Sequence, residues 1–378
     1  MGTAPSGPHG ALKPERLGER LVRRIRTEGP ISVAAFMAAA LHDPVGGYYA
    51  RQNPLGREGD FVTAPEISQI FGELIGVWCA DLWQRMGSPD PVELVEFGPG
   101  RGTLLADLLR AAATVPAFRR ALRLSLVETS PVLRAVQQER LAAAEPRFLC
   151  DAAELPDGPL IIIANEFFDA LPVRQLVRGE ADWAEILVAA DAGGGLAFAA
   201  GRESPVLSAL VPPLLRGSPP GTIFEIGPAA AALAASLGER LTRWPGAALL
   251  IDYGYFPSAA GATLAALRRH RPVAILDEPG TADLSAHVDF AAIAAAAKAG
   301  SAAVHGPVAQ GEWLRALGAE ARLAALMARA APAQRAVLEG GVRRLIDPAQ
   351  MGTLFKVMAL TSRGLPVPAG FATGSDGQ

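Results

Sequence analysis

The stretch that decides the fold is Leu94-Val95-Glu96-Phe97-Gly98-Pro99-Gly100-Arg101-Gly102-Thr103. An apolar run of strand type leads into three alternating glycines, and a helical pattern begins at Thr103. Glycines let the backbone turn tightly and approach a ligand without a Cβ in the way, and the start of a helix adds unpaired N–H groups. We interpret Gly98, Gly100 and Gly102 as a ligand-binding turn, with a purely structural turn as the alternative.

Apolar strand candidates alternate with helical patterns on both sides of this turn. The expected strands are Val92–Phe97, Leu122–Val127, Phe148–Cys150, Leu160–Ala164 and Ala248–Ile251, and the helices between them include Thr103–Ala113 and Val132–Ala144. Strands that alternate with helices predict a parallel, doubly wound α/β sheet of Rossmann-like type. A late strand, Leu354–Leu360, is expected to close the edge of this sheet.

The spacing of these elements divides the chain into four segments. Residues 1–90 form a mostly helical N-terminal cap, with a Gly-rich interruption from His42 to Pro65. Residues 91–165 are the first part of the core, and residues 166–246 are an inserted lid. Residues 247–378 complete the core and add C-terminal helices. Within the insertion, Val173–Val177 and Trp183–Val188 predict a hairpin, and Gly193–Gly195 predicts a further turn.

Composition excludes several classes of function. The 378 residues are 50% hydrophobic, with a net charge of -3 from mixed acidic and basic residues, which argues against a nucleic-acid partner. The apolar runs break before the roughly 20 residues that a membrane span needs. Cys79 and Cys150 are too few for a disulfide framework or a metal site. We therefore expect a cytoplasmic protein (of the mitochondrial matrix if the source is eukaryotic), without metal or stable membrane insertion; the oligomeric state stays open.

Acidic residues follow successive strands. Glu96 precedes the glycine turn, Glu128 ends the second strand, and Asp151 with Ala152 follows the third. Ligands of open α/β sheets bind at the carboxyl ends of the strands, where a carboxylate such as Glu128 can accept the ribose hydroxyls. The G-x-G-x-G spacing and Glu96 fit a methyltransferase better than a dinucleotide-binding dehydrogenase. These features predict S-adenosylmethionine as the cofactor.

The end of the fourth strand is the expected site of methyl transfer. Asn165 and Glu166 directly follow Ile161-Ile162-Ile163-Ala164. Transfer needs a polar group that orients the nucleophile in line with the sulfonium carbon, so both residues are candidate catalytic groups, and Asn165 is also a candidate cofactor contact. Phe168 is a candidate for packing against the cation or a flat substrate. The alternative is a capped helix start with a buried aromatic pair.

Several stretches resemble the MidA-like family of methyltransferases. They are Gly29–Met37, Asp43–Tyr49, Gly59–Gln69, Asn165–Pro172, Asp283–Phe290 and Met351–Lys356. The resemblance runs from about Leu17 to Leu360. It implies a class I S-adenosylmethionine-dependent methyltransferase, in which Asp151 and Ala152 resemble the segment that contacts adenine. Because the family includes a mitochondrial complex I assembly factor, the resemblance further implies a protein arginine N-methyltransferase that acts on a respiratory complex subunit.

Arginine methylation makes specific demands on the residues. A guanidinium is always charged and a poor nucleophile, so carboxylates are needed to hold it. By the resemblance, Glu166 corresponds to the first catalytic glutamate of arginine methyltransferases. The region of the second, Leu171–Val177, offers no acid, so Asp169 or Glu66 would take that role.

Residues farther along the chain complete the candidate site. Tyr49 and Glu66 lie in N-terminal stretches that could fold over the cofactor, which makes both candidate substrate contacts. The resemblance also includes His287 and Asp289, which could form a base and its orienting group. By contrast, Phe224-Glu225-Ile226-Gly227-Pro228 imitates the glycine turn but lacks the further glycines, and we interpret it as structural.

Three other functions stay open at this stage. An NAD-dependent oxidoreductase is disfavoured by the glycine spacing and by the late acid Glu128. A small-molecule methyltransferase would use the insertion as a closed pocket instead of a peptide groove. A non-catalytic assembly factor could bind the cofactor for structural reasons, but it would not need the polar groups of Asn165–Asp169.

Overall fold

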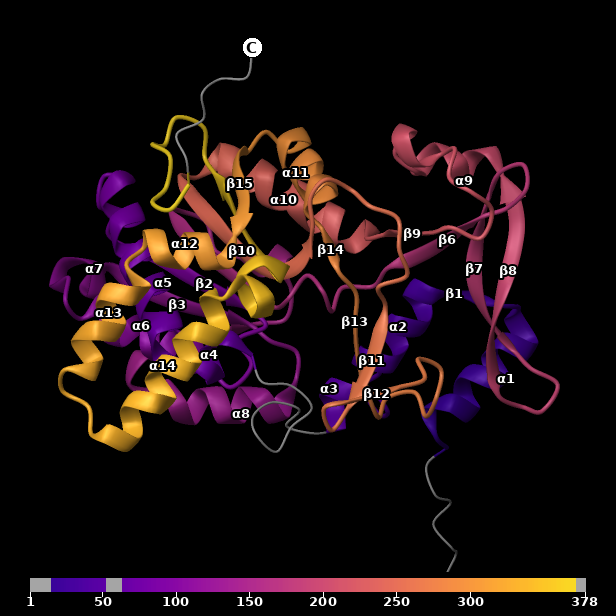
Figure 1. Ribbon diagram of the computed structural model, residues 1–378, viewed down its shortest axis with the longest axis horizontal. Coiled ribbons are helices and arrows are strands. Elements are labelled where there is room, and N and C mark those ends of the chain that lie inside the picture. The colour runs from indigo at the N-terminus through magenta and orange to yellow at the C-terminus, as the bar shows by residue number, and fades with distance from the viewer. Residues whose placement is uncertain (1–14, 52–62, 372–378) are drawn as a thin grey trace, which may run out of the picture.

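The computed structural model describes residues 15–51 and 63–371. The part of the family stretch from Gly59 to Val62 lies outside the described residues, as does part of the Gly-rich interruption between His42 and Pro65. Figure 1 shows a large α/β body that contains the main sheet and a smaller body built around a second sheet.

The main sheet has eight strands. These are β2 (Val92–Phe97), β3 (Leu122–Val127), β4 (Arg147–Leu149), β5 (Leu160–Asn165), β10 (Gly246–Tyr255), β14 (Val288–Asp289), β15 (Ala303–Ala309) and β16 (Phe355–Thr361). The order is β15-β16-β10-β5-β2-β3-β4, with β14 beside β10. From β4 to β10 all pairs are parallel, which confirms the parallel α/β core expected from the alternation of strands and helices.

The position of the last strand corrects one expectation. β16 does not close the sheet edge; it lies between β10 and β15 and is antiparallel to both. All of its residues except Lys356 are buried, and a strand buried to this degree needs neighbours on both sides. The edge is β15, which the sequence did not reveal because Gly306 and Pro307 interrupt its apolar pattern.

Alternate residues of the main sheet face two helical layers, as the pleat requires. Ile161 and Ile163 of β5 pack with α5 (Gln69–Arg85) and α6 (Thr103–Ala112). Ile162 and Ala164 pack on the opposite face with α10 (Pro228–Arg243) and α11 (Phe290–Ala299). Gly72 and Gly76 let α5 approach α6 closely, because a Cβ at either position would lie 2.7 Å from an atom of α6.

The second sheet joins the N-terminal segment to the insertion. Its strands are β1 (Ile31–Ser32), β7 (Trp183–Ala190), β6 (Arg174–Arg178) and β9 (Ile223–Ile226), in that order, with β8 (Leu196–Ser204) beside β7. The antiparallel pair β6–β7 and the turn that leads into β8 confirm the expected hairpin and the turn at Gly193–Gly195. Because β1 pairs with β7, the start of the chain and the insertion form one structural layer.

Other elements surround these two sheets. A small third sheet contains β12 (Arg271–Val273), β11 (Ala265–Arg268) and β13 (Asp283–Ser285). The remaining α-helices are α1 (Leu17–Glu28), α2 (Val33–His42), α3 (Tyr48–Arg51), α4 (Ala64–Ile67), α7 (Pro116–Ala121), α8 (Pro131–Arg140), α9 (Pro205–Leu210), α12 (Gln310–Ala316), α13 (Ala319–Met327) and α14 (Pro332–Ile346). Among the described residues, no helix combines the length and apolar character needed to span a bilayer.

Candidate active site

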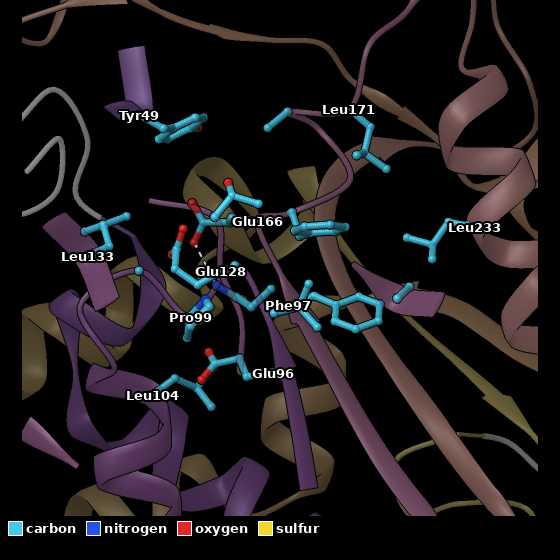
Figure 2. A pocket seen from close by; sticks show the side chains of 18 of the residues that line it. Tyr49, Glu96, Phe97, Pro99, Leu104, Glu128, Leu133, Glu166, Leu171 and Leu233 are labelled. Atoms are coloured by element: carbon cyan, nitrogen blue, oxygen red, sulfur yellow. Dashed lines mark hydrogen bonds between the residues drawn. The ribbon is translucent and has the colours of Figure 1, made fainter. Parts of the chain in front are cut away.

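A cavity of about 650 Å³ opens at the carboxyl ends of β2, β3, β4 and β5. This volume falls within the range of small-molecule sites, about 300–1,000 Å³. Figure 2 shows Glu96, Glu128 and Glu166 around it, with Tyr49 on one side and Leu233 on another. The cavity therefore lies where an open α/β sheet binds its ligands, and most of the residues that the sequence nominated line it. They are Tyr49, Glu66, Glu96, Gly98, Gly100, Glu128, Asp151, Ala152, Asn165 and Glu166.

The glycine turn has the backbone that its sequence demands. Gly98, Gly100 and Gly102 have φ angles of 59°, 55° and 73°, in the left-handed region that side chains with a Cβ rarely adopt. A Cβ on Gly98 would also lie 3.0 Å from the ring of Phe167. The turn therefore presents bare backbone to the cavity and leads directly into α6.

Glu96 is an acid without a full set of partners. It is buried, and its Oε2 atom has no hydrogen-bond partner within the described structure. Burial raises the pKa of this carboxyl to about 8. An orphaned buried oxygen beside the glycine turn is a ready acceptor for a positively charged group of a ligand.

Glu128 is held by a network that the sequence analysis missed. Its Oε1 accepts a hydrogen bond from the Ser130 N–H at 2.8 Å, and its Oε2 accepts one from Gln137 Nε2 at 3.1 Å. Gln137 also donates to the carbonyl oxygen of Gly100 at 2.6 Å. Burial raises the pKa of Glu128, and the Ser130 and Gln137 donors oppose that rise. A glutamine at a buried position of α8 was the available signal for this link.

Asp151 and Ala152 line the cavity after β4. The Asp151 Oδ1 atom accepts a hydrogen bond from the Ala153 N–H at 2.7 Å and so caps a short 3-10 helix, Ala152–Glu154. The same carboxylate is exposed at the cavity rim. Its capping bond fixes the orientation of the segment without using all of its acceptor capacity.

Glu166 occupies a strained position at the end of β5. Its φ angle is 50°, in the left-handed region, which is costly for a residue other than glycine. Its Oε1 accepts hydrogen bonds from the Ala64 N–H at 3.0 Å and from Asn165 Nδ2 at 3.2 Å. Burial raises the pKa of Glu166 to about 7, the Ala64 N–H opposes the rise, and Asp169 adds to it. The buried Oδ1 of Asn165 has no hydrogen-bond partner among the described residues.

Asp252, at the end of β10, holds the turn that contains Glu166. Its Oδ2 accepts hydrogen bonds from three successive backbone amides, those of Phe167, Phe168 and Asp169, at 3.0–3.2 Å. Its Oδ1 accepts a fourth from the Tyr253 N–H at 2.9 Å. From its place directly after the fifth strand, Asp252 is expected to line the floor of the site, but it is not among the residues that line the cavity. An acid at a strand end does not reveal which loop it meets.

Asp169 is close to Glu166 but is not among the residues that line the large cavity. Its Oδ2 accepts a hydrogen bond from the Tyr253 hydroxyl at 2.6 Å, and its buried Oδ1 has no partner in the described structure. Burial raises its pKa to about 6, and the Tyr253 hydroxyl opposes that rise. Glu66, by contrast, lines the cavity and accepts a hydrogen bond from the Thr103 hydroxyl at the start of α6.

The N-terminal segment forms one wall of the cavity. α4 begins at Ala64, whose N–H holds Glu166, and Glu66 follows two residues later. Tyr49 lines the same cavity and donates a hydrogen bond to Asp283 Oδ1 at 3.2 Å. The N-terminal segment therefore places Tyr49 and Glu66 in the same cavity as Glu166.

Besides Asp169, three nominated residues do not line this cavity: Gly102, Phe168 and His287. Phe168 is buried in the core, and its neighbour Phe167 lines the cavity instead, packed on Phe97 with ring centroids 5.4 Å apart. His287 lines a second, much smaller cavity, and Asp289 does not orient its ring but caps α11 through the Ala291 and Ala292 N–H groups. Within the described ranges, no cluster of histidine, cysteine and acidic residues suits a metal ion.

Comparisons with known proteins agree with this geometry. Residues 74–308 match the sequence model of the Methyltransf_28 family, described as "Putative S-adenosyl-L-methionine-dependent methyltransferase". The chain is 37% identical to the Drosophila melanogaster protein named protein arginine methyltransferase NDUFAF7 homolog, mitochondrial, over 94% of this chain and 86% of that protein. The human protein arginine methyltransferase NDUFAF7, mitochondrial, is 33% identical, over 90% of this chain and 82% of its own length.

A solved structure gives the same answer. A Burkholderia thailandensis protein bound to S-adenosyl-homocysteine superposes with a TM-score of 0.81 at 30% identity, over 94% of this chain and 93% of that protein. In the present chain, the left-handed glycine turn, the free oxygen of Glu96 and the acceptor Glu128 fit such a ligand. The chain is thus similar to the NDUFAF7 proteins, and its cofactor is S-adenosylmethionine. It belongs to the Methyltransf_28 family of S-adenosylmethionine-dependent methyltransferases.

Proposed function

We propose that this methyltransferase transfers the methyl group to the guanidinium of an arginine in a protein substrate, and that this substrate is a subunit of respiratory complex I. The names of the relatives support arginine as the acceptor. The MidA-like motifs support the complex I subunit. A cytoplasmic location, or the mitochondrial matrix in a eukaryote, goes with this substrate.

The observation that carries the proposal is a group of neighbouring carboxyls that form no ion pair with any described residue, although the positive charge of Arg344 opposes the rise in the pKa of Glu166. Glu166 is half-buried, Asp169 and Asp252 are buried, and the three carboxyls lie near one another at the ends of β5 and β10. None of the ion pairs between described residues involves them. A guanidinium is permanently charged, so its arrival would compensate these acids and favour their ionised forms.

Glu166 is the group that we assign to the transfer step. The acceptor nitrogen forms a bond to the methyl carbon, the bond from that carbon to sulfur breaks, and sulfur keeps the electron pair. The acceptor then carries one proton too many, and the Glu166 carboxylate can take it, because its pKa of about 7 suits proton transfer near neutral pH. The Ala64 N–H and Asn165 hold Oε1 in place during this step.

For the second carboxylate of an arginine methyltransferase we favour Glu66 over Asp169. Glu66 lines the cavity and belongs to the same short helix whose first N–H holds Glu166. Asp169 is instead engaged by the Tyr253 hydroxyl. In this proposal Glu66 and Glu166 hold the two sides of the guanidinium fork, and Asp169 supplies negative charge from behind.

Asp252 acts as a positioning residue in this scheme. It does not line the cavity, but its three amide contacts hold the left-handed turn that directs Glu166. We also propose that the insertion, residues 166–246, and the N-terminal cap, residues 1–90, supply the lid over the substrate from their described parts other than α5 and α10, which pack on the main sheet. The shared β1–β7 pairing and the cavity contacts of Tyr49, Leu171 and Leu233 support this division.

The direct test is mass spectrometry of methylated proteins in cells with and without the enzyme. We expect loss of methylarginine on a complex I subunit and restoration by the wild-type chain. A chain with Glu66→Gln should restore much less methylation than one with Asp169→Asn if Glu66 is the second carboxylate. Methyl groups on lysine, on a carboxylate or on a small metabolite, with none on arginine, would contradict the arginine assignment while leaving the methyltransferase family intact.

A further inference from the structure

The charges that line the cavity are unequal. Five carboxyls are present, those of Glu66, Glu96, Glu128, Asp151 and Glu166. Among the described lining residues, a single side chain bears a guanidinium or ammonium group, that of Arg101. S-adenosylmethionine has two positive groups, the sulfonium and the α-ammonium, and one negative group, the α-carboxylate. The acids suit the positive groups, but the carboxylate needs a different partner.

Arg101 is placed where that partner is needed. It lies between Gly100 and Gly102, directly before the first turn of α6. The first N–H groups of a helix lack intrahelical partners, and the positive end of the helix dipole favours an anion there. Arg101 lines the same cavity, so two sources of positive potential lie close to one end of it.

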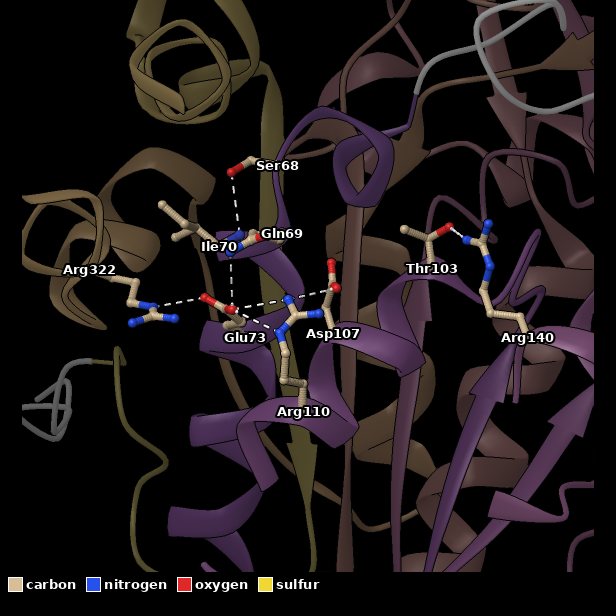
Figure 3. A network of polar contacts seen from close by, with 9 residues as sticks. All are labelled: Ser68, Gln69, Ile70, Glu73, Thr103, Asp107, Arg110, Arg140 and Arg322. Atoms are coloured by element: carbon tan, nitrogen blue, oxygen red, sulfur yellow. Dashed lines mark hydrogen bonds and ion pairs between the residues drawn. The ribbon is translucent and has the colours of Figure 1, made fainter. Parts of the chain in front are cut away.

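The side chain of Arg101 is also unengaged. Its Nε atom is buried without a hydrogen-bond partner, and no bond or ion pair ties the side chain to another described residue. Figure 3 shows the opposite arrangement for its neighbours. Arg110, at the other end of α6, pairs with Glu73 at 3.0 Å and with Asp107 at 2.8 Å, and Arg140 donates to the Thr103 hydroxyl. A buried donor with no protein partner indicates a missing acceptor.

We propose that the Arg101 guanidinium, together with the first turn of α6, binds the α-carboxylate of the methionyl part of the cofactor. The planar fork of an arginine matches a carboxylate with two parallel hydrogen bonds. This arrangement sets the orientation of the methionyl chain, with the α-carboxylate at α6 and the sulfonium toward Glu166. The inference concerns the cofactor alone and does not depend on which acceptor is methylated.

The experiment compares two ligands that differ in the part recognised. S-adenosylhomocysteine has the α-carboxylate, whereas 5′-methylthioadenosine lacks the whole amino-acid portion. By calorimetry, Arg101→Met should lower the affinity for S-adenosylhomocysteine about 10- to 100-fold, the loss expected for one charged hydrogen-bonding partner. Its affinity for 5′-methylthioadenosine should stay within about twofold. Arg101→Lys should fall between the wild type and Arg101→Met, because it keeps the charge and loses the fork.

Arg110→Met is the matched control, since it removes an arginine from α6, the helix that follows the glycine turn, at a position outside the cavity. It should leave the ratio of the two affinities unchanged. Equal weakening of both ligands by Arg101→Met would mean that Arg101 only supports the turn, and unchanged binding of both would mean that it does not touch the cofactor. Either result overturns the proposal. A further check is S-adenosylmethionine without its carboxyl group, which wild type and Arg101→Met should bind equally well.

Discussion

Two stretches of the chain share the pattern Glu-apolar-Gly-Pro and have opposite fates. Glu96-Phe97-Gly98-Pro99 ends β2 at the cavity, and Glu225-Ile226-Gly227-Pro228 ends β9 in the second sheet. Both glutamates are buried. No residue in the described part of the chain bonds to the Oε2 atom of Glu96. Glu225 instead accepts hydrogen bonds from Gln175 Nε2 and from the N–H groups of Thr263 and Leu264 at 2.8–3.0 Å.

The backbones of the two glycine turns also differ. Gly98 has a φ angle of 59° and Gly227 one of -103°, so only the first turn requires glycine. The comparison teaches that a buried acid serves a ligand where the fold leaves its oxygens unpaired, and serves the fold where backbone donors fill them. Glu96 belongs to the first group and Glu225 to the second. Glu128 and Glu166 lie between the two, because each accepts hydrogen bonds from protein donors and also lines the cavity.

Glu166→Gln should give the largest effect, a loss of methyl transfer. It tests whether the acid at the end of β5 also serves a ligand. We expect single-turnover methyl transfer at saturating cofactor to fall about 100- to 1,000-fold, or about 2.7–4 kcal/mol, because one preorganised charge is lost. Cofactor affinity should stay nearly constant. Glu225→Gln, the same substitution at a buried glutamate outside the large cavity, is the control, with a normal rate per folded molecule. A near-normal rate for Glu166→Gln would rule out its role in transfer.

Gly98→Val tests the backbone half of the comparison. A β-branched side chain at this positive φ costs about 1–2 kcal/mol, and its Cβ would lie 3.0 Å from Phe167. We expect the calorimetric affinity for S-adenosylhomocysteine to fall roughly 100-fold. Gly227→Ala should bind normally, because its Cβ would meet Ala230 at an ordinary 3.4 Å. Equal affinities in the two variants would remove the distinction between the turns.

Glu128→Ala separates an acid that binds ligand from one that supports the fold. The variant should lose about 1.5–3 kcal/mol of affinity for S-adenosylhomocysteine, roughly 10- to 150-fold, since ribose hydroxyls lose a charged acceptor. Glu225→Ala should instead lower the free energy of unfolding by about 1–3 kcal/mol, because the Thr263 and Leu264 N–H groups lose their acceptor. A loss below about twofold for a folded Glu128→Ala would make Glu128 a structural residue only.

The smallest effect concerns pH. The pKa of Glu96 is raised from 4.5 to about 8 in the folded state, so between these values the folded chain binds more protons than the unfolded chain. Stability therefore falls as pH rises through this window. Glu96→Gln removes the titration, and above about pH 8 we expect it to be more stable than the ligand-free wild type by at least about 1.4 kcal/mol, the equivalent of one pKa unit. Urea unfolding at several pH values checks this, and parallel curves would argue against it.

Much of the core and several site residues could be predicted before the structure. β2 and β3 have the expected bounds, and β4, β5 and β10 lie within a few residues of theirs. The reason is that buried parallel strands are nearly continuous apolar runs, and their carboxyl ends meet at one edge. That rule alone brings Glu96, Glu128 and Asn165 to a common cavity.

The contacts that complete the site are of another kind. The Ala64 N–H meets Glu166 across 102 residues of chain, Asp252 meets Phe167 across 85, and Gln137 meets Gly100 across 37. No local sequence pattern predicts such a hydrogen-bonded pair, because the two residues belong to different elements and the hydrophobic pattern of one element is unrelated to that of the other. The pairing of β1 with β7 and the position of β16 inside the sheet are of the same type.

By itself, then, the sequence determined what depends on neighbouring residues: the apolar strands, the helices between them, and a turn that only glycines can make at positive φ. The tertiary structure alone decided which buried acids keep a free oxygen. Glu96 and Glu225 have almost the same local sequence, and they differ because Thr263, Leu264 and Gln175 reach one and no described residue reaches Oε2 of the other. Whether a buried polar atom stays unpaired is a property of the packed fold. It distinguishes a residue that can bind a ligand from one that stabilises the fold.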